Sequence, residues 1–379
     1  MVPSMNPGRR ASGINSRQCR KICRWSPVPT MTCRSARPGG VEKGVLGGGF
    51  AVSVPGMSRV EIRPFAAGDL TGCGALLAER HRRHRVTQPL LSPRFEAVEA
   101  AVAELTAVFK TGDASGAVAI RAGVPVGFVL GAPKTSPVWG PNIWVEAAGQ
   151  AVTDAEVMRD LYAAAATRWV DEGRTAHYVV VPADDADLVR AWFRLGFGQQ
   201  HAHAIRPAER PVVASRADGL SVRRATRADI PELARLDLEL PTHQGRSPTF
   251  SAGRVGTIEE SLADWADDID NPDFATFVAV RDGMVIGSAI GCALEKSSSH
   301  LSLARPDNAG FLGFAAVFPS ARGTGAGRAL GEAVIGWAAD SGFGSVVTDW
   351  RVTNLLSSRA WPRLGFTETF LRLHRTIGY

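Results

Sequence analysis

The sequence has few cysteines and no long apolar run. Five of its 379 residues are Cys, and three of these, Cys19, Cys23 and Cys33, lie within the first 56 residues at a spacing that fits no common zinc pattern. The remaining two, Cys73 and Cys292, cannot build a disulfide framework. No stretch of 18 or more apolar residues occurs, so we predict no membrane span. These absences indicate a metal-free protein of the reducing cytoplasm.

Acids are almost missing from residues 1–56. Nine Lys or Arg stand there against one acid, Glu42, so the rest of the chain carries a net charge of −2 although the whole carries +6. The segment is rich in Arg, Ser, Pro and Gly, and its composition overlaps with that of organelle transit peptides, but it lacks the apolar core of a secretory signal. We expect a disordered basic tail or an over-long gene start, with translation from Met57. The body of the chain is not predicted to bind nucleic acid.

Two halves of the chain repeat one another. RAGVPVG at 121–127 and RDGMVIG at 281–287 match at an offset of 160 residues, and AWFRLGF at 191–197 matches AWPRLGF at 360–366. A period of this length indicates two copies of one globular domain. We predict the first at 59–206 and the second at 220–379, with a linker at 207–219 that is rich in Pro, Arg and Ala.

Each copy has the same order of expected elements. A short strand leads into a helix, a second helical stretch follows at 93–109 or 255–268, and a hairpin then forms around the shared glycine turn. The second copy continues with a strand at 310–317, a helix that Gly342 ends, a strand at 345–350, another helix and a last strand. This order predicts mixed α/β domains, each with a twisted, mainly antiparallel sheet flanked by helices.

The stretch RGTGAG at 322–327 follows a predicted strand and opens a predicted helix. Its glycines leave backbone N–H groups open at a helix N-terminus, where an anion is favoured, and Arg322 can add a charged contact to a phosphate. The stretch lacks the Lys-Ser/Thr pair of a P-loop and does not give GxGxxG, so it is neither of the two common nucleotide loops.

The run from Ala315 to Leu330 resembles motif A of the GNAT N-acetyltransferases, whose loop cradles the pyrophosphate of acetyl-CoA. Asn354 with Leu364-Gly365-Phe366 resembles motif B of that family. The resemblance covers the whole second copy and, more weakly, the first. It implies an acetyl-CoA site with the following members: Ala315, Ala316, Val317, Arg322, Gly323, Thr324, Gly325, Ala326, Gly327, Asn354 and Trp361.

Both copies depart from the family pattern. Trp361 stands where the family commonly has a Tyr that protonates the leaving thiolate, and an indole N–H cannot act as an acid. The first copy has no RxxGxG and carries Asp154 and Glu156 in that region, so we expect it to have lost acetyl-CoA binding.

Acetyl transfer to an amine also needs a proton acceptor. Our first candidate is Asp349, for which fixing the next turn or pairing with Arg351 is the alternative. The second is Glu295, for which a solvated strand end is the alternative. His300 and His374 are weaker candidates, because a lone His is more often a surface or packing residue.

An acidic cluster on the second helical stretch could attract a cationic acceptor or be a solvated face. It comprises Glu259, Glu260, Asp264, Asp267, Asp268 and Asp270. The sequence thus predicts an acetyl-CoA-dependent N-acetyltransferase, monomeric or homodimeric, that acts on a small-molecule or peptide amine without nucleic acid or membrane. A non-catalytic acyl-CoA sensor is the alternative.

Overall fold

The computed structural model describes residues 60–211, 219–251 and 254–378. The predicted basic tail lies outside these ranges, as does the middle of the predicted linker. Within them, no helix is both long and apolar enough to cross a bilayer.

The two halves have closely related element orders. The first half contains β1 (Val60–Pro64), α2 (Leu70–Thr87), α3 (Val98–Phe109), β2 (Ser115–Arg121), β3 (Val124–Gly131), β4 (Asn142–Val145), β5 (Gln150–Val152), α4 (Ala155–Asp171), β6 (Ala176–Pro182), α5 (Ala186–Arg194) and β7 (Gly198–Pro207). The second contains β8 (Leu220–Arg224), α6 (Ile230–Gln244), α7 (Ile258–Asp268), β9 (Phe274–Arg281), β10 (Met284–Ala293), β11 (Ala309–Val317), α8 (Ala326–Asp340), β12 (Ser345–Arg351), α9 (Ser357–Arg363) and β13 (Thr367–Thr376). The predicted mixed α/β class is confirmed.

Local interactions recur between the halves at the offset seen in the sequence. Arg63 forms an ion pair with Asp69, and Arg223 forms one with Asp229, each joining the first strand of its half to the start of the next helix. The hairpin turns also correspond, since Gly123 and Gly283 both have φ near +75 to +79°. Glycine adopts this conformation without a steric penalty, which explains why both hairpins turn at that residue.

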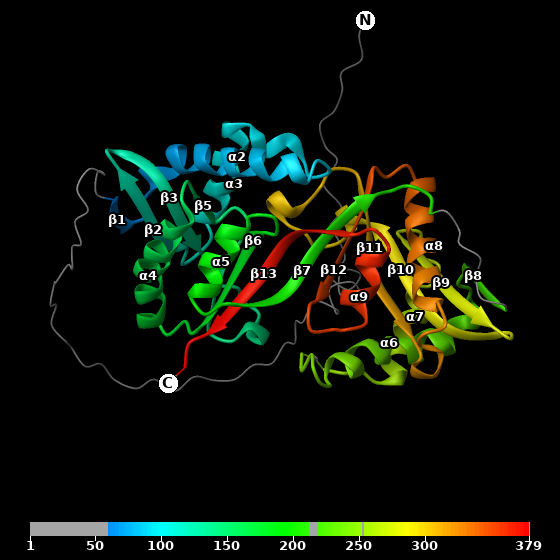
Figure 1. Cartoon of the computed structure of the whole chain (residues 1–379). Helices are drawn as coiled ribbons and strands as arrows, with labels where there is room; N and C mark the ends of the chain where they lie inside the picture. The colour runs from blue at the N-terminus through cyan, green and yellow to red at the C-terminus, as the bar shows by residue number, and fades with distance from the viewer. Residues whose placement is uncertain (1–59, 212–218, 252–253, 379) are drawn as a thin grey trace, which may run out of the picture.

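The strands form two sheets (Figure 1). One has the order β1-β2-β3-β5. The other has nine strands in the order β4-β6-β13-β7-β12-β11-β10-β9-β8 and runs through both halves. At its centre, β7 pairs with β12 of the second half, and β13 pairs with β6 of the first half. The last strand of each half therefore lies in the other half's part of the sheet, and the two exchanged strands pair with each other.

Helices cover both faces of these sheets. One apolar cluster runs continuously under α4 and α8 and includes Val179 and Val346 from the two halves of the sheet. On the other face, α2 and α3 pack over Val180 and Phe370, while α6 and α7 pack around Phe314. The core thus joins the two halves on one face and is divided between two helix pairs on the other.

Candidate acyl-CoA cleft

The site begins where two neighbouring strands separate. β11 and β12 run parallel and pair only from Ala309 to Leu312 and from Ser345 to Thr348. Beyond this point β12 stays paired with β7 on its other side, and β11 stays paired with β10. The register of β10 against β11 skips Gly313, which marks a β-bulge where the two parallel strands part. The edge of β11 from Gly313 to Val317 that faces β12 is therefore left without a strand partner.

The predicted glycine loop leads directly into α8. Gly323 and Gly325 have φ of +79° and +87°, and Gly325 is the N-cap residue of the helix. Among the residues that the structure describes, no side chain caps this end of α8, and a Cβ at either glycine would meet no atom within 4 Å. The first N–H groups of a 15-residue helix consequently open toward free space, as an anion site requires.

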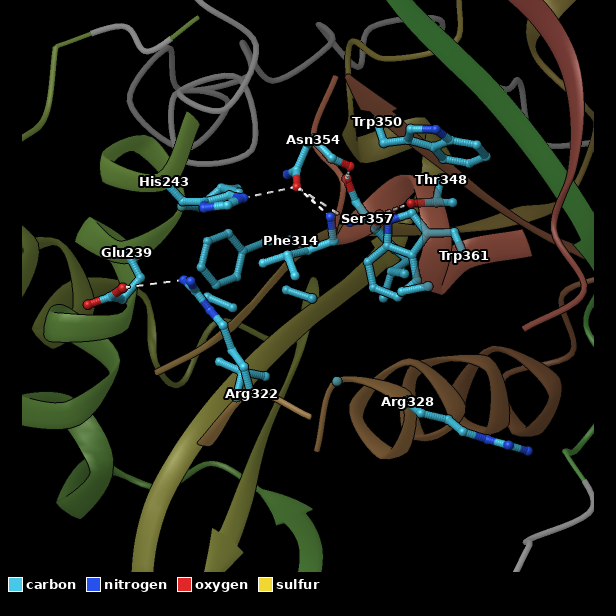
Figure 2. A pocket seen from close by; sticks show the side chains of 18 of the residues that line it. Glu239, His243, Phe314, Arg322, Arg328, Thr348, Trp350, Asn354, Ser357 and Trp361 are labelled. Atoms are coloured by element: carbon cyan, nitrogen blue, oxygen red, sulfur yellow. Dashed lines mark hydrogen bonds and ion pairs between the residues drawn. The ribbon is translucent and has the colours of Figure 1, made fainter. Parts of the chain in front are cut away.

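A cavity of about 380 Å³ joins the helix end to the gap between the strands (Figure 2). Apart from Thr324, all of the residues predicted for the acetyl-CoA site line it. The Thr324 hydroxyl instead donates a hydrogen bond to the Ala321 carbonyl and braces the loop. The indole of Trp361 lies near Ser357 on the wall formed by α9.

Helix α6 supplies polar groups that the sequence did not reveal. Arg322 approaches Glu239 of α6, with Nη2 and Oε2 3.8 Å apart, and His243 donates a hydrogen bond of 3.1 Å to Oδ1 of Asn354 (Figure 2). Because α6 precedes the motifs by about 80 residues and has no motif of its own, no sequence pattern indicates that it faces them.

Asp349 lies where β12 leaves β11, and it also lines the cavity. His201 of the exchanged strand β7 donates a hydrogen bond of 2.9 Å to its Oδ1. His300 lies 3.5 Å from its Oδ2, and the ring of His203 lies 4.6 Å from that of His300. The alternative pairing of Asp349 with Arg351 is not seen, because no ion pair joins these two side chains among the described residues.

The charge state of this group follows from burial and proximity. Burial by itself would raise the pKa of Asp349, but the two histidines outweigh it and hold that pKa well below its usual range. Burial, helped by the positive charge of Arg372, lowers the pKa of His201 to about 4. At neutral pH the pair is therefore an anionic carboxylate hydrogen-bonded to a neutral imidazole, which can accept one proton.

The part of the chain that forms most of this cleft matches a known protein family. Residues 241–366, which include the strand, the glycine loop and the Asn354 region, match the acetyltransferase (GNAT) family. This part of the chain is a GNAT acetyltransferase domain. No curated protein matches the chain in sequence.

Solved structures resemble the chain at low identity. A GCN5-related N-acetyltransferase from Sphaerobacter thermophilus is 13% identical, with a TM-score of 0.51. The match covers 84% of this chain and 97% of the solved one, and the coverages below are given in the same order. A tandem GNAT protein of the clavulanic acid biosynthesis pathway is 15% identical, with 85% and 99% covered and a TM-score of 0.43. An aminoglycoside N-acetyltransferase in complex with CoA is 24% identical, with 44% and 97% covered and a TM-score of 0.33. The first shares the GNAT fold with this chain.

Three other candidates do not themselves line the cleft cavity. Glu295 is exposed in a 3-10 turn and lines a second cavity, of about 470 Å³, beside Arg94 and Arg305. His374 stacks on Tyr178 of the first half. His300, expected to be a surface or packing residue, is buried against Asp349.

None of the six acidic residues on and after α7 lines the cleft cavity. Asp270 forms an ion pair with Arg227, and Glu260 accepts a hydrogen bond from the backbone N–H of Thr257 at the start of the helix. These two carboxylates have structural partners.

The corresponding region of the first half is closed by its own side chains. β4 and β6 pair in parallel as β11 and β12 do. Beyond that pairing, Gln150 donates to the Val180 carbonyl and accepts from the Trp192 indole, so a fully buried amide bridges the gap between β5 and β6. At the start of α4, Asp154 accepts a hydrogen bond from the Glu156 N–H and caps the helix that would face a phosphate.

Proposed function

We propose that this protein transfers the acetyl group of acetyl-CoA to a primary amine, and that the reaction takes place in the second half. One observation carries the proposal: a single cavity connects an uncapped, glycine-lined helix N-terminus to an unpaired strand edge. A helix end of this kind favours phosphate oxygens, and a free strand edge can pair with an amide-containing arm.

Named residues divide the binding of acetyl-CoA among them. The N–H groups from Gly325 to Gly327 and the guanidinium of Arg322 would hold the pyrophosphate, with Arg322 leaving its weak contact with Glu239. The edge of β11 would pair with the pantetheine arm, and Asn354 would add a hydrogen bond. Backbone N–H groups of β11 near the bulge at Gly313 would polarise the thioester carbonyl.

Asp349 and His201 would take the proton that the amine loses. The carboxylate of Asp349 is ionised at neutral pH, and it lies at the point where the strands open. Trp361 cannot protonate the leaving thiolate, but the thiolate of CoA is a stable leaving group whose conjugate acid resembles a cysteine thiol. A side-chain acid is therefore dispensable here.

The first half would serve as a partner that binds no acetyl-CoA. Gln150 and Trp192 occupy the place of the strand gap, and Asp154 occupies the helix end. Its contribution to the reaction would be the exchanged strand β7, which carries His201. Both cysteines of the described residues are buried and unpaired, as suits the reducing cytoplasm in which we place the protein.

Calorimetric titration of the full chain with acetyl-CoA tests the proposal. We expect one site per chain, lost in Gly325→Val because φ at that position is +87°. Gly342→Val is the matched control, since Gly342 has φ of +77° at the other end of α8 and an equally open surrounding. Two sites would refute the closed first half, and no site would refute the cleft. Release of CoA in the presence of amines then separates an enzyme from a sensor.

A further inference from the structure

Arg351, the last residue of β12, is a largely buried cation on the wall of the cleft. It is 5% exposed and lines the cleft cavity. No hydrogen bond or ion pair joins its guanidinium to any residue in the described part of the chain. Burial lowers the pKa of Arg351, and the negative charge of Asp349 opposes this shift. A guanidinium on a cavity wall that has no bonded carboxylate is available to an anion that enters the cavity.

A second arginine lies in the same row of the sheet. Arg351 on β12 and Arg372 on β13 are both cross-strand neighbours of His201 on β7. Arg372 donates through Nε to Gln200 and lies over the rings of Trp139 and Trp144. Its Nη2 is buried and has no hydrogen-bond partner in the described ranges of the chain. Burial and the nearby charge of Arg351 lower the pKa of Arg372 to about 10.

The carboxylates around these arginines are already engaged. Asp349 accepts its hydrogen bond from His201, and Glu146 forms an ion pair with Lys134 at 2.6 Å. His201, His374 and Tyr178 also face the two guanidiniums, and none of these three is an anion at neutral pH. Lys134 balances the charge of Glu146, whereas the neutral His201 leaves the charge of Asp349 unbalanced. The two guanidiniums therefore stand against one carboxylate charge, and one negative charge is missing.

The position of this excess charge relates it to the reaction. Asp349 and Arg351 are two residues apart on one strand, so their side chains leave the same face of the sheet. The row that contains both arginines thus lies beside the proposed proton acceptor. If an anionic group of the acceptor bound to this row, an amine close to that group in the same molecule would lie at the end of the cleft.

We propose that Arg351 and Arg372 bind a carboxylate of the acceptor, which makes the substrate an amino acid or a short peptide whose amine lies close to its carboxylate. The forked guanidinium matches a carboxylate in geometry, and the carboxylate of the acceptor would supply the missing negative charge. Trp139, Trp144 and Tyr178 border the site with apolar ring surface. This inference rests on the proposed function, because it names the acceptor of the same reaction.

The experiment compares each amino acid with its carboxamide. Release of CoA by the full chain is measured for the twenty amino acids and their amides, and the binding of their N-acetylated products is measured by calorimetry, which requires no turnover. The variants are Arg351→Met, Arg351→Lys and, as a matched control, Arg359→Met, which removes an exposed arginine of α9. The unfolding midpoint of each variant checks that it folds.

We expect at least one acid to bind about tenfold or more tightly than its amide, the loss of a charged hydrogen bond being of this size. Arg351→Met should remove the preference, Arg351→Lys should restore part of it, and Arg359→Met should keep it. Equal binding of acids and amides, or no binding of any acid, overturns the inference. The proposed function has a different refutation, which is that acetyl-CoA itself does not bind in the calorimetric titration.

Discussion

Two buried histidines of α2 should make the protein sensitive to mild acid. His81 is fully buried and His84 is 3% exposed, and burial lowers their pKa to about 4 and about 3. The unfolded chain protonates both near their ordinary pKa of about 6.5, so it binds more protons than the folded protein between pH 6.5 and pH 4. Stability must therefore fall as the pH falls through this range.

The loss can be worked out from these values. Between pH 7 and pH 5 each histidine contributes about 2 kcal/mol, or about 4 kcal/mol for the pair. Asp184 lies 3.3 Å from Nε2 of His84 and favours its charged form, so about 2 kcal/mol is the most that His84 contributes. Asp229, with a pKa of about 2, loses its stabilising charge only in more acidic solution. Carboxylates that are present in both proteins contribute equally to the two curves and cancel in the comparison of a histidine variant with the wild type.

Urea unfolding of the wild type and of His84→Leu, followed by circular dichroism at pH 7, 6 and 5, measures the effect. The free energy of unfolding of the variant should fall by about 2 kcal/mol less than that of the wild type between pH 7 and pH 5. Parallel curves for the two proteins would show that His84 is not held neutral by the fold, and the reasoning would be refuted.

Three further outcomes follow from the site. Asp349→Asn should lower kcat about 100-fold while the Kd for acetyl-CoA stays unchanged, and an unchanged kcat would exclude Asp349 as the proton acceptor. His201→Gln, a change in the first half of the chain, should also lower kcat and should alter the pH profile; an effect on KM alone would argue for a structural role. A fragment of residues 220–379 should be insoluble or unfolded, because β12 and β13 would both lack β7; a soluble fragment that binds acetyl-CoA would contradict this.

Sequence reasoning located the cleft because its determinants are local. A glycine loop between a strand and a helix can be read from adjacent residues, and the family match includes that loop. Asp349 is a candidate on similarly local grounds, since it lies near the end of the predicted strand at 345–350, and it lines the cavity. Glu295 also lies close to the end of a strand, but it belongs to the 3-10 turn after β10 and lines the second cavity, beside Arg94 and Arg305.

What sequence reasoning missed depends on contacts between distant segments. His201 reaches Asp349 only because β7 leaves its own half, and periodicity within one strand cannot say which strand it will pair with. Glu239 and His243 belong to a helix with no motif, and only packing places them over the cleft. The excess positive charge at Arg351 is likewise a property of an assembled sheet.

Because β7 and β13 are exchanged within one chain, a substitution can change one half and leave the other unchanged. This is not possible in a symmetric dimer. In a dimer of identical chains every substitution appears at both sites, so one site cannot be filled while the other is kept. In this single chain, Gln150 and Trp192 close one strand gap while the other stays open. The half with the filled gap nevertheless cannot be discarded, since the neighbouring half depends on its last strand for both an edge and a histidine.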